Sequence, residues 1–185
     1  INFKKIYGIE YSQKGIDICK STISGVFVKK DLTKPNLNKI INEKFDVITC
    51  CDVLEHLDNP ESVINNAFDL LKKDGQFLIT LPGGPMTEFD KSIGHRFHYT
   101  PNSLANLIHR TKFKNFKVKT IGFPFFNLYR LMLLIRGSRL IDDVEKKGVR
   151  NNLLFSIFGY LFIFLFKFNL NFINKGWQVV AICKK

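Results

Sequence analysis

The hydrophobic positions of this chain fall into short runs separated by polar or amphipathic segments. Most of the runs are continuously apolar, which is typical of strands covered on both faces of a sheet. One run, at 116–121, alternates between apolar and polar residues instead. Together the runs predict strands over residues 5–10, 25–28, 45–51, 76–81, 116–121 and 177–183.

Apolar residues at helical spacing lie between these strands. Asn59 before Pro60 and Thr100 before Pro101 each place a capping residue ahead of a proline, which favours a helix start. Lys72 and Lys73 favour a helix end, and Asp74-Gly75 predicts that the helix closes there. The predicted helices are 14–22, 60–73, 101–108, 128–135 and 153–168, with a short helical turn at 39–42.

Strands that alternate with helices predict a three-layer α/β fold with a mostly parallel sheet. The last strand follows a long helical excursion and is predicted to run antiparallel. The chain of 185 residues is long enough for one domain with a substantial core. We therefore predict a single domain over 1–185, with a hydrophobic helical insertion at about 123–170.

The charge is strongly positive, with a formal net charge of +12. The lysines are scattered in pairs and form no dense basic run, so the sequence favours no nucleic-acid partner. Four cysteines without a CxxC pair indicate reduced thiols and a cytoplasmic location. No secretory signal opens the chain at Ile1, and a missing beginning is predicted.

Polar residues follow the predicted strands at the point where each strand ends. Ligands of open α/β sheets bind outside the carboxyl ends of the strands, so these residues are expected to line one crevice. A carboxylate after an early strand, Glu10, suits the two hydroxyls of a ribose. Asp31, one strand later, could accept a hydrogen bond from an exocyclic amine. The other members are Cys51-Asp52 and Pro82-Gly83.

Several segments in this order resemble motifs of the class I S-adenosylmethionine-dependent methyltransferases of small-molecule type. They are YGIEYS, KKDL, FDVITCCDVLEHL and LLKKDGQFLITLP, followed by GHRFHYTPNSL. The resemblance covers nearly the whole chain, and the order and spacing of the motifs are more specific than any single one. It implies a Rossmann-like fold, S-adenosyl-L-methionine as the cofactor and methyl transfer to a metabolite, sugar or lipid intermediate.

The resemblance also assigns cofactor contacts. Glu10 would bind the ribose hydroxyls, and Asp31 and Leu32 would contact the adenine. The methionine portion of the cofactor would be bordered by Cys50, Cys51 and Asp52. Helix capping is the alternative for Asp52, and core packing is the alternative for the two cysteines.

One part of the family pattern is absent. The first strand and its glycine-rich turn should precede Lys5, and no such segment stands there. The sequence therefore predicts a fragment that binds the cofactor weakly or not at all. A truncated, non-catalytic interaction protein is the competing interpretation. A nicotinamide-dependent Rossmann enzyme is disfavoured by LEHL and by the lack of a Tyr-x-x-x-Lys pair.

The loop 82–99 carries the candidate chemistry of the transfer. His95 ranks first and His98 second as a general base or acceptor-binding group. Arg96 is a candidate anion contact and Tyr99 a candidate wall of the acceptor site, whereas His56 either contacts the substrate or holds the turn after a strand. A purely structural lid remains the alternative for this loop. Zinc binding by His95-x-x-His98 is disfavoured, because no third ligand stands at a recognised spacing.

Residues 153–168 are almost wholly apolar but shorter than the roughly 20 residues of a spanning helix. A helix that packs on the sheet or on a second copy in a homodimer is the favoured interpretation. The alternative is a peripheral membrane contact, with Lys146, Lys147, Arg150 and Lys167 facing anionic lipid. Membrane docking would suit a lipid-linked or hydrophobic acceptor.

Overall fold

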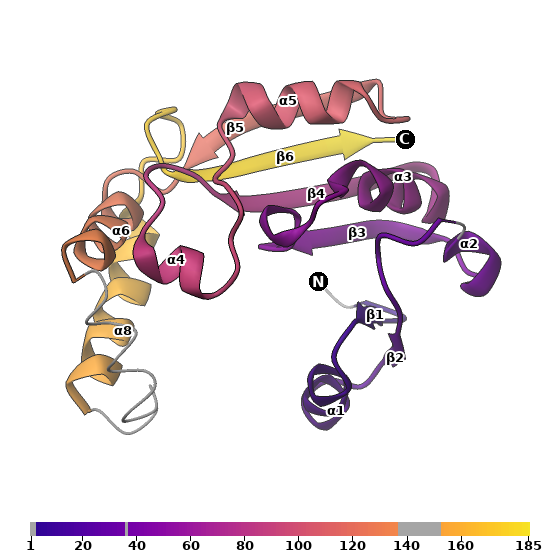
Figure 1. Ribbon diagram of the computed structural model, residues 1–185, viewed down its shortest axis with the longest axis horizontal. Helices are drawn as coiled ribbons and strands as arrows, with labels where there is room; N and C mark the ends of the chain where they lie inside the picture. Colours follow the sequence, from indigo (N-terminus) through magenta and orange to yellow (C-terminus); the bar gives the residue numbers. More distant parts are fainter. Residues whose placement is uncertain (1–2, 36, 137–152) are drawn as a thin grey trace.

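The computed structural model describes residues 3–35, 37–136 and 153–185, and its larger sheet has four strands (Figure 1). Their order across the sheet is β3 (Phe45–Cys51), β4 (Leu71–Pro82), β6 (Gln178–Lys184) and β5 (Asn115–Ile121). β3 and β4 are parallel, whereas β6 runs antiparallel to both of its neighbours. The predicted antiparallel last strand is confirmed.

A second, two-stranded sheet contains β1 (Tyr7–Glu10) and β2 (Val26–Lys29), which are parallel. The connection between them is α1 (Gln13–Thr22), whose first turn is capped by the Ser12 side chain. Ile16 is the buried residue of this short amphipathic helix. Figure 1 shows that β1, α1 and β2 form a unit beside the β3 edge of the larger sheet.

Two helices pack together on one face of the larger sheet. They are α3 (Pro60–Leu70) and α5 (Pro101–His109), and each starts with the predicted cap and proline. Their apolar stripes meet the inward-facing residues of the strands and form the main core. Phe113, fully buried after α5, packs against the rings of Phe68 and Phe77.

The helix α3 ends at Leu70, earlier than the sequence indicated, and β4 begins at the next residue. Leu71 pairs with Phe45, but the next pair is Gln76 with Val47, so residues 72–75 bulge out of the strand. Asp74 adopts a left-handed φ of 62° in this bulge. Lysines favour a helix end and a strand bulge alike, so the pattern could not separate the two.

The predicted loop after β4 contains one further helix, α4 (Glu88–Ser92). It starts with a capping box: the Thr87 hydroxyl accepts a hydrogen bond from the Asp90 N–H, and the Asp90 carboxylate accepts one from the Thr87 N–H. Two short elements, α2 (Leu37–Ile40) and η1 (Leu54–His56), flank β3.

The hydrophobic insertion forms helices at the end of the molecule remote from β1 and β2 (Figure 1). They are α6 (Phe125–Arg136), α8 (Leu153–Leu165) and η3 (Phe166–Phe168). Aromatic side chains join them, as Tyr129 contacts both Phe162 and Phe166. Lys146, Lys147 and Arg150 lie outside the described residues.

The β1–β2 unit is attached to the larger sheet by a small apolar cluster around Leu37, Ile41 and Leu70. The rings of Tyr7 and Phe45 meet edge to face at 5.3 Å. Asn66, on α3, adds a polar anchor. Its Nδ2 donates to the carbonyl oxygens of Leu32 and Lys34 at 2.9 and 2.8 Å.

Replacement of Asn66 by Ala should therefore weaken the attachment of the segment after β2. The change leaves two partly buried carbonyls without their donor and should lower the free energy of unfolding by about 2 kcal/mol. Chemical denaturation would measure the loss. Asn106→Ala, at an exposed position of α5, is the control and should change stability by less than about 0.5 kcal/mol. Equal effects of the two changes would contradict this anchor.

Candidate functional site

A cluster of titratable side chains lies where β3 and β4 end. After β3, Asp52 adopts a left-handed φ of 51° and its N–H donates to the Thr80 carbonyl at 2.9 Å. The chain turns there and enters η1, which carries Glu55 and His56. This turn explains why an apolar strand runs directly into polar residues. Asp52, the first residue after β3, redirects the chain over the carboxyl edge of the sheet.

The loop after β4 returns two histidines to the same place. Gly83 donates to the Trp177 carbonyl at 2.6 Å, and Gly84 adopts a φ of 70° against the Trp177 ring. A Cβ on Gly84 would lie 2.7 Å from ring atoms, so only glycine fits this close approach. The loop then passes through α4 and presents His95 and His98.

The hydrogen bonds fix the tautomers of both imidazoles. His98 Nδ1 lies 3.1 Å from the Gly84 carbonyl oxygen, so Nδ1 carries the proton and donates. His98 Nε2 is then an acceptor, and His95 Nδ1 donates to it across 3.2 Å. The remaining nitrogen, His95 Nε2, therefore holds a free lone pair. Burial, with the neighbouring His56, holds the pKa of His95 below its ordinary value.

Glu55 faces this lone pair. Its carboxyl group is fully buried, and neither oxygen has a hydrogen-bond partner within the described residues. Glu55 Oε1 lies 4.0 Å from His95 Nε2, which is too long for a hydrogen bond but is its nearest basic neighbour. Burial raises the pKa of Glu55 to about 7. The Glu55 carboxyl can therefore hold a proton near neutral pH, beside the lone pair of His95.

A buried ion pair supports the histidines from behind. Arg130 on α6 donates to both oxygens of Asp90 at 2.9 and 2.7 Å. Burial alone would raise the pKa of Asp90, but the hydrogen bonds from Arg130 and Thr87 outweigh it and hold the pKa well below its usual range. The permanently charged carboxylate lies 3.6 Å from His98 Nε2.

Arg96 and His56 close the other side of the cluster. The Arg96 guanidinium donates to the His56 carbonyl at 2.8 Å and pairs with Asp58. Its backbone N–H donates to the Glu55 carbonyl at 2.9 Å. The His56 ring packs edge to face on His95 with centroids 4.6 Å apart. Arg96 thus connects the loop that carries His95 and His98 to η1. Its contact with an anion of the acceptor stays a prediction.

Asp52 and the two cysteines lie at the same strand end. Gln178 Nε2 approaches Asp52 Oδ1 at 3.5 Å. Cys50 is buried in the main core, and burial raises the pKa of its thiol to about 12. This favours packing, the alternative that the sequence left open for Cys50. Cys51 faces the opposite side of the sheet and is exposed.

Glu10 and Asp31 follow β1 and β2, and the parallel register of these strands brings both acids to one edge of the pair. Glu10 Oε1 accepts a hydrogen bond from the Ser12 N–H at 2.8 Å. Asp31 Oδ1 accepts bonds from Thr33, which lower the pKa of Asp31. Leu32 is half-buried between the two apolar clusters.

The three carboxylates do not touch one another in the described structure. Glu10 ends β1 and Asp31 follows β2 of the smaller sheet, whereas Asp52 follows β3 of the larger one. Each accepts a hydrogen bond from a different neighbour. Their joint cofactor site therefore stays a prediction.

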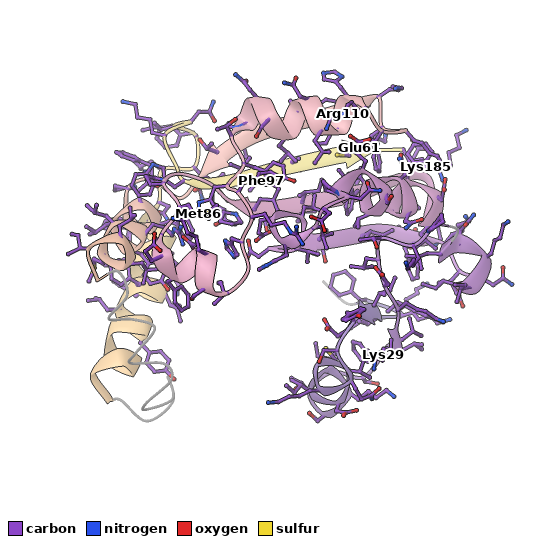
Figure 2. All side chains as sticks on the ribbon, in the orientation of Figure 1. Lys29, Glu61, Met86, Phe97, Arg110 and Lys185 are labelled. Carbon is purple, nitrogen blue, oxygen red and sulfur yellow. The ribbon has the colours of Figure 1, made fainter. Side chains whose placement is uncertain are left out.

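Tyr99 lines a hollow of about 440 Å³ between the start of α3 and one side of α5. The same hollow includes Phe97 and is bordered by Glu61 and Arg110, which pair at 2.5 Å and are labelled in Figure 2. None of the clustered histidines lines it. The Tyr99 hydroxyl is buried without a hydrogen-bond partner in the described residues, and burial raises the pKa of Tyr99 well above its ordinary value, so the hydroxyl keeps its proton.

Two groups of side chains have atoms close enough to share a metal ion. One is Asp90, His95 and His98, and the other is Glu55, His56 and His95. Both oxygens of Asp90 are already engaged by Arg130, and His98 Nε2 accepts from His95. The first group therefore has few free lone pairs for zinc.

Sequence reasoning missed Glu55, Asp90 and Arg130 as members of this cluster. Glu55 stands in the quoted LEHL motif, so its position was visible although its burial was not. The pattern Thr87-x-x-Asp90 is a capping-box spacing and could have predicted α4. Nothing in the sequence indicated that Arg130, 40 residues later, would reach Asp90.

Comparison with known proteins identifies the fold and the family. The family described as "Methyltransferase domain" matches residues 1–118 of the 185, which is more than half of the chain. An S-adenosylmethionine-dependent methyltransferase of Thermotoga maritima matches with a TM-score of 0.59 and 17% identity, over 97% of this chain and 72% of that one. A second such methyltransferase, of Archaeoglobus fulgidus, matches with a TM-score of 0.55 and 14% identity, over 97% of this chain and 75% of that one. The predicted Rossmann-like α/β fold is confirmed.

Among curated relatives, the ubiquinone biosynthesis O-methyltransferase of Dechloromonas aromatica is 32% identical over 96 residues. The alignment covers 50% of this chain and 41% of that protein. The chain thus spans less than half the length of this relative.

The Glu55 carboxyl predicts a pH-dependent stability. Its pKa is raised to about 7 in the folded protein, so the folded state binds the proton more tightly than the unfolded chain does. The resulting stabilisation is full below about pH 4.5 and is lost as the pH rises through about 7. The difference in unfolding free energy between wild type and Glu55→Gln should fall by on the order of 2 kcal/mol between about pH 5 and pH 8.

Denaturation at several pH values would measure this difference, because the neutral Gln cannot titrate. Glu88→Gln, at an exposed position of α4, is the control and should give a difference that does not change with pH. A flat difference for Glu55→Gln as well would show that its carboxyl is ionised in the folded protein.

Proposed function

Because the chain belongs to the S-adenosylmethionine-dependent methyltransferases, we propose that its protein transfers a methyl group from S-adenosyl-L-methionine to a small-molecule acceptor. The observation that carries the proposal is the buried proton-holding cluster of Glu55 and His95 at the carboxyl ends of β3 and β4. Open α/β sheets bind their ligands at this edge. The Glu55–His95 cluster thus lies at the edge of the sheet where this fold binds its ligands.

We propose that Glu10 and Asp31 hold the adenosine half of the cofactor. Both lie at one edge of a parallel strand pair and are half-exposed, and the described hydrogen bonds engage only one oxygen of each carboxylate. Asp52 and Cys51, after β3, are the proposed neighbours of the methionine half. When bound, the cofactor supplies a methyl group on a sulfonium centre, which needs alignment with the acceptor more than activation.

The two sheets leave a place for one more strand. β3 is the last strand of the larger sheet, and β1 pairs within the described residues only with β2. We infer that a segment preceding residue 3 adds a strand between β1 and β3 and joins both halves of the cofactor site.

The kind of acceptor atom that suits this site depends on whether a base stands ready to remove its proton. An oxygen acceptor loses its proton as the new bond to carbon forms, so a base beside it accelerates the transfer. His95 Nε2 is the free basic nitrogen of the cluster, with Nδ1 fixed by His98. The relative named ubiquinone biosynthesis O-methyltransferase supports an oxygen of a small molecule as the acceptor atom.

Cofactor binding is the first test. Isothermal titration calorimetry of the 185-residue chain with S-adenosylhomocysteine should show a dissociation constant weaker than micromolar, because one wall of the site is open. A polypeptide that also carries the preceding strand should bind at least tenfold more tightly, and Glu10→Ala in it should lose at least about tenfold. Micromolar binding by the 185-residue chain would refute the additional strand.

Replacement of His95 tests the chemistry in the cofactor-binding polypeptide. His95→Gln should reduce kcat by on the order of 10² to 10⁴ and abolish the acidic limb of the pH–rate profile, since the protonated base is inactive. His109→Gln, on the exposed side of α5, should leave both unchanged. An unaltered pH profile in His95→Gln would assign the loop a purely structural role. Cofactor binding without any methyl transfer would favour the non-catalytic interpretation.

A further inference from the structure

The helices beyond β5 carry an apolar surface that the proposed methyl transfer does not use. The family match ends at residue 118, whereas α6, α8 and η3 follow it. Phe162 and Phe166 point toward α6, where they contact Tyr129. Four other apolar residues of α8 are exposed to solvent: Tyr160, Leu161, Ile163 and Phe164.

An aromatic ridge runs along the outer side of these helices, formed by Tyr160, Phe164 and Phe168. Their residues are 74%, 54% and 56% exposed, and successive members stand four positions apart. This spacing places them one above the other on a helix surface, and the rings of Phe164 and Phe168 meet at 5.3 Å. Such a stripe of exposed large aromatic side chains marks an interaction surface.

The charges around the ridge indicate its partner. Residues 120–136 and 153–177 contain no Asp or Glu, and their basic residues are Arg130, Arg136, Lys167 and Lys175. Lys167 and Lys175 are exposed, and Lys167 adjoins Phe168 in the chain. The acids Asp142, Asp143 and Glu145 lie in 137–152, outside the described residues. Within the described helices, a surface of aromatic and cationic side chains without an acid is complementary to an anionic, partly apolar surface.

A second copy of the chain fits this surface less well. A symmetric dimer would place the same patch on both sides, so the lysines of one subunit would approach those of the other. The helices offer no carboxylate that could pair with them. A lipid headgroup layer supplies the missing negative charge, while its acyl boundary accommodates the aromatic rings.

The length of α8 determines whether it could cross a bilayer or only lie on its surface. α8 has 13 residues and is about 20 Å long, whereas the hydrocarbon core of a bilayer is about 30 Å thick. No helix in the described residues has the length and hydrophobicity to cross a membrane. We propose that the aromatic ridge docks α8 on the surface of an anionic phospholipid membrane, with its axis in the plane of the interface.

Vesicle flotation tests this surface without cofactor or acceptor, so its outcome is independent of methyl transfer. The protein should float with vesicles of phosphatidylcholine and phosphatidylglycerol, and should remain at the bottom with phosphatidylcholine alone. The triple variant Tyr160→Ser, Phe164→Ser, Phe168→Ser should lose at least about tenfold in membrane partitioning. Lys167→Glu with Lys175→Glu should lose on the order of tenfold or more and should weaken the response to salt.

The matched control replaces two exposed apolar residues of the remote β1–β2 unit. Tyr11 and Ile18 are 74% and 56% exposed, and Tyr11→Ser with Ile18→Ser should float like the wild type. Circular dichroism of each variant verifies that it is folded. Failure of the wild type to float, or equal flotation of the ridge variant, would overturn the proposal. A dimer seen by light scattering that the ridge variant dissociates, without flotation, would assign the ridge to a second copy.

Discussion

The buried ion pair between Asp90 and Arg130 is the interaction on which the arrangement of the site depends. It joins the loop after β4 to α6, two elements that the chain reaches 40 residues apart. Burying two charges is costly unless their hydrogen bonds are satisfied. Here both carboxylate oxygens accept from the guanidinium, while the Arg130 Nε–H has no partner among the described residues. The pair fixes α4, and α4 in turn sets where His95 and His98 return to the edge of the sheet.

This arrangement gives the two histidines different tasks. His98 is held on both sides, by the Gly84 carbonyl and by His95, and has no lone pair left for a substrate. His95 is held on one side only, and its Nε2 faces the unpaired carboxyl of Glu55. Of the two histidines of the loop, only His95 therefore keeps a basic nitrogen free. The structural-lid interpretation requires the same rigidity and is compatible with this geometry.

The sequence predicted the strands well because each was marked by local signals. Continuous apolar runs and the paired cap and proline at Asn59-Pro60 and Thr100-Pro101 depend only on neighbouring residues. The predicted helix end at Lys72-Lys73 was wrong because a strand bulge has the same polar composition. Contacts between distant segments, such as Asp90 with Arg130, leave no local pattern. The burial of Glu55 was equally hidden, since it depends on how the histidine loop folds over η1.

The position of the aromatic ridge relative to the cluster adds a constraint on the acceptor. Arg130 belongs to α6, and α6 packs on α8 through Tyr129. The helix α6 thus contacts the Asp90 side of the cluster through Arg130 and contacts α8 through the neighbouring Tyr129. A membrane-bound α8 would hold α6, and with it the carboxyl edge of the sheet, close to the headgroup layer. An acceptor dissolved in that layer would reach the site by lateral diffusion, whereas a water-soluble acceptor would gain nothing from the docking.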